Sequence, residues 1–263
     1  MVEDRARDLS AGHRLFARYA YAPNSLGYCG PAGAAVLRAA ASGSGATDQV
    51  PQLARGFSGA WPYQAIVAEL AGLGDPLDER VVRAYWTGNE LTDAVDRDAF
   101  ARALLTRIGP QAGRYWAHLD ESLLAEAAPT HAFHVLAVYP WSRLLDTGRP
   151  EPLEVLDSCR IRWARVVEVG PERLQVRSAR LRYDGHRLLL GPDQDELVDR
   201  RTDGATFVDR VDVGDLVAVH WGLACEVLTG DRAATLERWT RWQLDAMAPR
   251  LQVAAVHEDE RFA

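Results

Sequence analysis

The segment Val213-Gly-Asp-Leu-Val-Ala-Val-His-Trp-Gly-Leu-Ala-Cys-Glu-Val-Leu228 decides the fold of the second half of the chain. Its two apolar runs, separated by Trp-Gly after His220, predict a pair of buried strands joined by a tight turn. Upstream, the apolar residues that follow Cys159 predict another strand, over 159–169. We therefore expect a small β-barrel with a cysteine in its first strand and a histidine near its last turn. A thiol and an imidazole placed together could handle a metal fragment.

Further strands are predicted between these two ends. Residues 174–183 alternate apolar and charged side chains, which is typical of a half-buried strand. Asp184-Gly185 predicts a hairpin, with returning pieces at 186–190 and 197–208. Short strands at this spacing indicate an OB-like barrel. Asp231 then begins a predicted helix that runs to about Met247.

The first half of the chain predicts mainly helices, from apolar residues at helical spacing. The predicted helices cover residues 4–20, 31–41, 61–73, 78–87, 96–108 and 115–127. Residues 130–139 fit either a helix or a buried strand, and 148–152 read as a linker. We thus expect an α+β protein with a helical domain over 1–152, followed by a barrel domain with a C-terminal helix over 153–263.

Composition excludes several classes of protein. A net charge of −7 over 263 residues argues against a general nucleic-acid binder, which needs clustered cations. No apolar run is long enough to cross a bilayer, and the charged N-terminus lacks the apolar core of a signal peptide, so we expect no membrane insertion and a cytoplasmic protein. Three cysteines without CxxC spacing predict neither a disulfide framework nor a structural zinc site.

The second half resembles the HypC/HupF/HoxL-type chaperones of nickel–iron hydrogenase maturation. Their barrel ends in Val-Gly-Asp-φ-Val-x-Val-His-x-Gly-φ-Ala-φ-Glu-φ-Leu, where φ is hydrophobic, and a helix follows. The residues that match this pattern are Val213, Gly214, Asp215, Val217, Val219, His220, Gly222, Ala224, Glu226 and Leu228. Val166 to Val169 match the family's first strand, and Cys159 lies at the position of the family cysteine. The resemblance covers roughly residues 157–250.

The resemblance implies a non-enzymatic assembly factor. Such chaperones work with a HypD-type scaffold protein to hold a transient iron that carries cyanide and carbon monoxide, and they deliver it to the precursor of the hydrogenase large subunit. Cys159 and His220 would be the residues that bind this iron. In the family the cysteine follows the initiator methionine, whereas 158 residues precede it here and the Pro-Gly after it is missing. A derived scaffold or adaptor role in the same pathway therefore stays open.

Each of these two residues also has a plain structural interpretation. Arg160 and Arg162 flank Cys159 and are expected to favour its thiolate, the form that binds metal. Otherwise Cys159 is a small buried hydrophobe. His220 is either a neutral imidazole that acts as a ligand for iron or as a hydrogen-bond partner for iron-bound cyanide, or it is a histidine that fixes a turn.

A second resemblance concerns Cys29. The segment Tyr28-Cys-Gly-Pro-Ala32 is similar to the nucleophile segment of papain-like peptidases of the bacteriocin-processing type. That resemblance implies a thiol hydrolase with Cys29 as nucleophile, His134 as base and Asp146 as the carboxylate that orients it. We expect Cys29 at a helix N-terminus, where the pKa of a thiol is lowered. The structural alternative is a cysteine in turn chemistry before a helix.

His131 and His134 are spaced to share one helical face. Structural histidines are the simpler interpretation, because no acidic ligand is near and no HExxH pattern exists. If Cys29 approaches them in space, Cys29, His131 and His134 would form a possible second iron-handling site.

Overall fold

The computed structural model describes residues 2–108 and 121–262. Helices occupy its first half, and a sheet and a long final helix occupy its second half, which confirms the α+β class and the predicted order of these parts. The helical elements that precede the sheet are α1 (Val2–Ser25), α2 (Ala34–Ser42), α3 (Val50–Ala54), α4 (Trp61–Leu70), α5 (Glu79–Trp86), α6 (Glu90–Ala94), α7 (Arg97–Ile108), η3 (Glu121–Glu126), α8 (His131–Phe133), η4 (His134–Val138), η5 (Pro140–Thr147) and α9 (Glu151–Cys159). The helix after the sheet is α10 (Gly230–Phe262).

Local sequence signals set several of these helix ends. The Asp78 side chain accepts a hydrogen bond from the backbone N–H of Arg80 and caps the start of α5. Asn89 and Thr92 form a capping box at the start of α6. Gly43 ends α2 in the left-handed conformation that favours glycine. None of the helices in the described part of the chain combines the length and apolar character needed to cross a membrane.

The strands form one sheet that closes on itself, together with a separate small hairpin. The strands are β1 (Arg162–Val169), β2 (Arg173–Tyr183), β3 (Leu188–Asp199), β4 (Arg201–Thr202), β5 (Ala205–Thr206), β6 (Leu216–His220) and β7 (Leu223–Leu228). The order β1-β2-β3-β7-β6 returns to its start because β6 also pairs with β1. Its neighbours are antiparallel except β3 and β7, which meet in parallel at Asp199 and Leu223. We call this unit the closed sheet.

The β2–β3 hairpin turns at Asp184-Gly185, as the sequence predicts. The Asp184 carboxylate accepts hydrogen bonds from the backbone N–H groups of His186 and Arg187. Gly185 has a φ of 93°, which a residue with a side chain rarely adopts. The returning strand β3 extends to Asp199 and is therefore much longer than the predicted piece at 186–190.

The second decisive turn joins β6 to β7 and confirms the predicted strand pair. His220 pairs with Leu223, so the turn consists of Trp221 and Gly222 alone. Both have positive φ, 50° and 75°, which suits the twist of a two-residue hairpin. Trp221 is a bulky residue in a region that only glycine enters freely, and its ring stacks on Tyr28 at 4.1 Å between centroids. This contact holds the turn against the loop after α1.

One apolar core joins the helices to the closed sheet. It includes Phe16 and Tyr85 from the helices together with Ala218, Leu223 and Cys225 from β6 and β7. A second cluster fills the interior of the closed sheet, around Val166, Leu174, Val176, Val217 and Val219. The predicted division between residues 152 and 153 falls inside α9.

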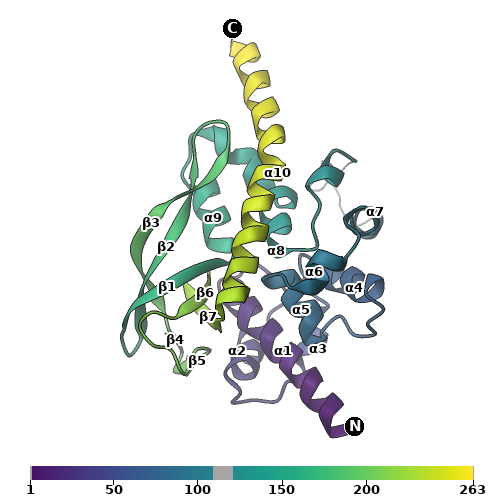
Figure 1. Cartoon of the computed structure of the whole chain (residues 1–263), viewed down its shortest axis with the longest axis vertical. Helices are drawn as coiled ribbons and strands as arrows, with labels where there is room; N and C mark the ends of the chain where they lie inside the picture. The colour runs from purple at the N-terminus through teal and green to yellow at the C-terminus, as the bar shows by residue number, and fades with distance from the viewer. Residues whose placement is uncertain (1, 109–120, 263) are drawn as a thin grey trace.

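A buried carboxylate strengthens the same junction. Glu226 on β7 accepts hydrogen bonds from the hydroxyl of Tyr19, 2.8 Å away, and from the guanidinium of Arg83, 3.1 Å away. Arg232, at the start of α10, also donates to it. Figure 1 shows α10 running between the strands and the helices α4–α7, and it contacts α8 as well as β1, β3, β6 and β7.

The structure corrects or completes several element predictions. Residues 131–138 are helical and include the π-helix η4, so the strand alternative for 130–139 is wrong. The sequence predicts that Cys159 lies in the first strand, but it is the last residue of α9, and β1 begins only at Arg162. The predicted linker at 148–152 leads into this helix instead of into a strand. Of the predicted helix at 115–127, residues 115–120 lie outside the described residues, and 121–126 form the 3-10 helix η3.

Candidate metal centre

Three elements bring together two imidazoles and one thiol. His131 begins α8, Cys159 ends α9 and His220 ends β6. One ring nitrogen of each histidine and the sulfur of Cys159 all lie within 4.8 Å of one another. The structure thus brings Cys159 and His220 to the same point, and it adds His131, which the sequence analysis had grouped with Cys29 and His134.

His220 is held by one nitrogen and leaves the other without a partner. Its side chain is fully buried, and Nδ1 lies 2.7 Å from the carbonyl oxygen of Tyr19. A carbonyl only accepts, so Nδ1 carries the proton and Nε2 presents a lone pair. Nε2 is buried and has no hydrogen-bond partner among the described residues, although the backbone of Cys159 lies close enough to the ring to oppose the lowering of its pKa. Burial lowers the pKa of His220 to about 4, so the ring is neutral at pH 7.

His131 and Tyr85 together have more hydrogen-bond contacts than protons. Its Nδ1 lies 3.0 Å from the hydroxyl of Tyr85, which also donates to the carbonyl oxygen of Gly59 at 3.1 Å. Its Nε2 lies 2.8 Å from the carbonyl oxygen of Cys159. A neutral imidazole and one phenol supply two protons for these three contacts. Burial and the neighbouring histidines hold the pKa of His131 well below its usual range, so a second ring proton is not available at pH 7.

Cys159 is a protonated thiol in this environment. Burial, and then the proximity of Cys29, raise the pKa of Cys159 to about 12, against a smaller lowering contribution from the indole of Trp221. The expectation that Arg160 and Arg162 favour the thiolate is wrong, because both guanidinium groups turn away. Arg160 pairs with Asp157 at 2.9 Å, and Arg162 pairs with Glu196.

The cluster opens into a cavity of about 110 Å³, and this cavity also contains the second predicted site. Cys29 and His134 line the same space as His131, Cys159 and His220. The stacked rings of Tyr28 and Trp221 form part of its wall. A cavity needs roughly 10–15 Å³ to hold one water, so there is room for several small molecules. The two predicted sites are therefore parts of one pocket.

The geometry of the predicted hydrolase residues differs from what that reaction requires. Helix α2 begins at Ala34, so Cys29 is not at its N-terminus, and burial raises the pKa of Cys29 to about 11. Burial also lowers the pKa of His134 to about 4. These shifts oppose a thiolate–imidazolium pair. Asp146 accepts a hydrogen bond from Tyr183 and is not among the residues that line the pocket, and its role of orienting His134 stays a prediction.

His134 fits beside the cluster because residue 59 is glycine. A Cβ on Gly59 would lie 2.5 Å from Nε2 of His134 and 2.9 Å from its Cε1. The π-helix that starts at His134 widens the helix there, and such turns occur often at functional sites. Gly59 also accepts the hydrogen bond of Tyr85, so its backbone supports both histidines.

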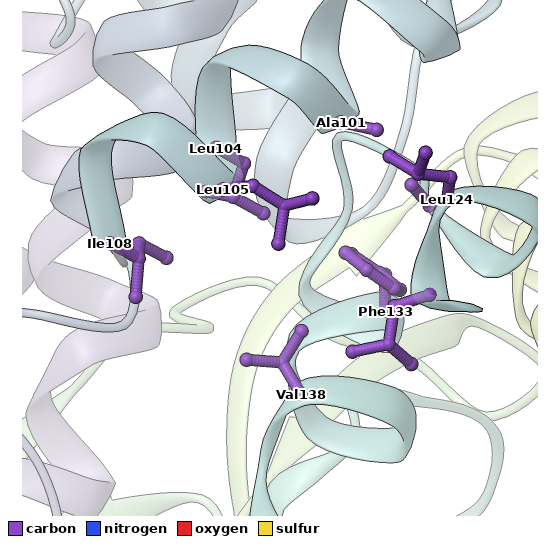
Figure 2. A pocket seen from close by; sticks show the side chains of 9 residues that line it. Ala101, Leu104, Leu105, Ile108, Leu124, Phe133 and Val138 are labelled. Carbon is purple, nitrogen blue, oxygen red and sulfur yellow. The ribbon is translucent and has the colours of Figure 1, made fainter. Parts of the chain in front are cut away.

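A second pocket, shown in Figure 2, is lined by no polar or ionisable side chain that could bind a metal or catalyse a reaction. It measures about 20 Å³, and its nine lining side chains are all hydrocarbon. They come from α7, η3 and the segment from Ala127 to Val138, so this pocket marks the packing of α7 against Phe133. Phe133 lies two residues after His131, and this packing helps to fix the position of α8.

Comparisons with known proteins give the family of the chain. A search of curated proteins and a search of solved structures found no match. A family model matches residues 8–254, a range that spans both the helices and the closed sheet. The chain therefore belongs to the family of unknown function DUF6390.

Proposed function

We propose that this protein is a maturation factor for a nickel–iron hydrogenase and that it handles the iron fragment that carries cyanide and carbon monoxide. The observation that carries the proposal is the convergence of Cys159 with His220, the two residues that the resemblance to HypC-type chaperones singles out. In this proposal the closed sheet is an OB-like barrel, and the iron fragment is a cargo that the protein receives and passes on.

The chemistry of the pocket suits such a cargo. Thiolate and neutral imidazole are ligands that iron accepts. The cavity of about 110 Å³ beside them leaves room for small diatomic ligands. The indole N–H of Trp221 lies beside the thiol and could donate a hydrogen bond to the nitrogen of a bound cyanide. Tyr85 and Trp86 are among the aromatic side chains of its other walls.

The proposal includes two partners and a location. A HypD-type scaffold protein would supply the iron fragment, and the precursor of the hydrogenase large subunit would receive it. The exchange would take place in the cytoplasm. An adaptor role without direct carriage of iron is the variant of this proposal that the departures around Cys159 leave open.

Anaerobic co-expression with a HypD-type scaffold tests the proposal. We expect a complex that survives purification and shows infrared bands of metal-bound cyanide and carbon monoxide. Cys159→Ala should abolish the bands, whereas Cys225→Ala, which removes a thiol from the core, should keep them. A complex without these bands would support the adaptor role. No complex, or a complex that Cys159→Ala leaves unchanged with its bands intact, would contradict the proposal.

A further inference from the structure

The pair Cys159 and His220 offers only two ligands, whereas the folded chain offers a third. His131 comes from the helical half, 28 residues before Cys159, and its ring lies 5.2 Å from the ring of His220 between centroids. We infer that the chain by itself binds a divalent transition-metal ion through His131, Cys159 and His220, without a ligand from any partner protein. This inference deepens the proposed function, because it concerns the same pocket, but it does not need a hydrogenase to be true.

The hydrogen bonds of His220 favour Nε2 as its ligand atom, whereas His131 offers Nε2 only in the tautomer that carries the ring proton on Nδ1. For His220, Nδ1–H donates to the carbonyl of Tyr19, and Nε2 is left as a buried lone pair. For His131, an Nδ1 proton would complete a chain in which His131 donates to Tyr85 and Tyr85 donates to Gly59. Metal-binding histidines commonly donate their other N–H to a carbonyl or a similar group in this way.

An ion on Nε2 of His131 would require the proton of that ring to lie on Nδ1. Without an ion, Nε2–H of His131 can donate to the carbonyl oxygen of Cys159, 2.8 Å away, while Nδ1 accepts from the hydroxyl of Tyr85. With the proton on Nδ1, Nε2 and this carbonyl oxygen would both be acceptors, and a cation between them would remove their repulsion. An ion on Nε2 would turn this lone pair into a ligand and leave every other contact of the ring satisfied.

The distances require only a small contraction. The three ligand atoms lie within 4.8 Å of one another. In a tetrahedral zinc site, bonds of about 2.0–2.1 Å to nitrogen and about 2.3 Å to sulfur place the ligand atoms roughly 3.3–3.7 Å apart. Side-chain movements of about 1 Å would therefore close the site. A fourth position would face the cavity, as in zinc sites that bind an exogenous ligand.

The ligand set indicates the class of ion. Two imidazoles and one thiolate suit Zn²⁺, Co²⁺ and Fe²⁺, whereas Mg²⁺ and Ca²⁺ prefer oxygen ligands. Binding converts the Cys159 thiol to a metal-bound thiolate, and its proton passes to the solvent, so each ion bound releases one proton.

The wild-type chain, purified alone and freed of metal, gives the first test. Titration with Co²⁺ under anaerobic conditions should produce one equivalent of bound ion with a sulfur-to-cobalt charge-transfer band. X-ray absorption of the Zn²⁺-loaded chain should show one sulfur and at least two imidazoles around the ion. A shell of oxygen ligands without sulfur, or no binding at all, would overturn the inference. Because the probe is a bare ion, this result is independent of whether the hydrogenase proposal succeeds.

A matched pair of tyrosine variants tests the role of His131 without removing a ligand. Tyr85→Phe deletes the hydroxyl that positions His131 and should weaken Zn²⁺ binding by about 10–100-fold. Tyr63→Phe is the control, since Tyr63 is also fully buried, lies 5.3 Å from Tyr85 between ring centroids, and its hydroxyl has no partner among the described residues. It should bind Zn²⁺ as the wild type does. Equal affinities for both variants would remove His131 from the site.

Direct replacement of the ligands completes the test. His131→Gln should reduce the affinity more than Tyr85→Phe does, and Cys159→Ser should eliminate the charge-transfer band. Circular dichroism of each variant establishes that it is folded. If His131→Gln fails to fold, the ligand shell of the wild type and the tyrosine pair still decide the question.

Discussion

Helix α9 carries residues of two buried polar clusters that differ in one respect. On one side Asp157 accepts hydrogen bonds from Arg160, Arg180 and the backbone N–H of Leu181, so its buried carboxylate is fully engaged. At the end of this helix, Cys159 lies beside His131 and His220. Nε2 of His220 has no hydrogen-bond partner there, and His131 and Tyr85 supply two protons for three contacts. The first cluster is complete within the chain, and the second is not.

The difference separates buried polar groups that are paired within the chain from a group that has an unpaired atom beside a cavity. More than about 90% of buried polar groups in proteins have hydrogen-bond partners, because an unsatisfied one costs roughly 1–3 kcal/mol. The Asp157 cluster follows this rule. The lone pair of His220 departs from it beside a cavity, which is where a bound ligand could supply the missing partner.

The largest expected effect comes from breaking the complete cluster. Asp157→Asn keeps the shape of the side chain but removes the charge opposite Arg160, whose side chain is only 2% exposed. Removing one partner of a buried ion pair costs roughly 3–5 kcal/mol, because it leaves an uncompensated charge. We expect a loss of this size in the free energy of unfolding, measured by urea denaturation. Asp195→Asn, at an exposed pair with Arg177, should change little. Equal losses in both variants would contradict the distinction.

The alkylation rate of Cys29 tests the environment of the cavity beside the incomplete cluster. The pKa of Cys29, raised from 9.0 to about 11, means that its thiolate fraction at pH 7 is about 100-fold lower than for an unperturbed thiol. Alkylation by iodoacetamide should therefore be slow at pH 7 and increase about tenfold for each pH unit up to about pH 11. Fast alkylation of Cys29 at pH 7 that is slowed by His134→Ala would instead support the thiol hydrolase.

A smaller effect is expected from filling the space beside His134. In Gly59→Ala the new Cβ would lie 2.5 Å from Nε2 of His134, so the ring must move. Overpacking of this kind costs roughly 1–3 kcal/mol, which thermal or urea unfolding will show. Gly74→Ala is the control, because a Cβ there meets nothing within 4 Å. If both variants are equally stable, His134 is not held against Gly59.

The smallest effect concerns Glu196, a half-buried carboxylate that pairs with Arg180 at the edge of the Asp157 cluster. Burial acts to raise the pKa of Glu196, but hydrogen bonds from Arg162 and Ser178 and the charges of Arg162 and Arg180 outweigh it, so its pKa is lowered. A lowered pKa in the folded state stabilises the protein above the unfolded pKa, and this contribution is lost as the pH falls through the folded value. Glu196→Gln should thus lose less stability than the wild type between about pH 5 and pH 3. Glu168→Gln, on the exposed side of β1, should show the slope of the wild type. An unchanged slope for Glu196→Gln would contradict the argument.

Much of the closed sheet could be predicted from local patterns. The paired runs of 213–228 and the Asp184-Gly185 turn encode strands and hairpins through neighbouring residues, and both are present in the structure. The helices around Pro62, Asp78 and Asp96 also follow local signals. Residues 130–139 could not be assigned, because a short apolar run fits a helix and a buried strand equally well.

The composition of the pocket was only partly predictable. Cys159 and His220 were identified through a segment resemblance, and His131 was identified for its spacing to His134. No sequence pattern related His131 to His220, which lies 89 positions later, or showed that Arg160 turns toward Asp157. The expected effect of Arg160 on the thiol failed because a neighbour in sequence need not be a neighbour in space.

By itself, the sequence determined the α+β class, the order of the parts, the hairpin turns and the pair of residues worth examining, because periodicity, caps and turns act over a few positions. Only the tertiary structure decided that His131 joins Cys159 and His220, that Cys29 and His134 share their cavity, and which polar atoms stay unpaired. These features depend on burial and on contacts between α8, α9 and β6, and burial also sets the protonation of the thiols and imidazoles.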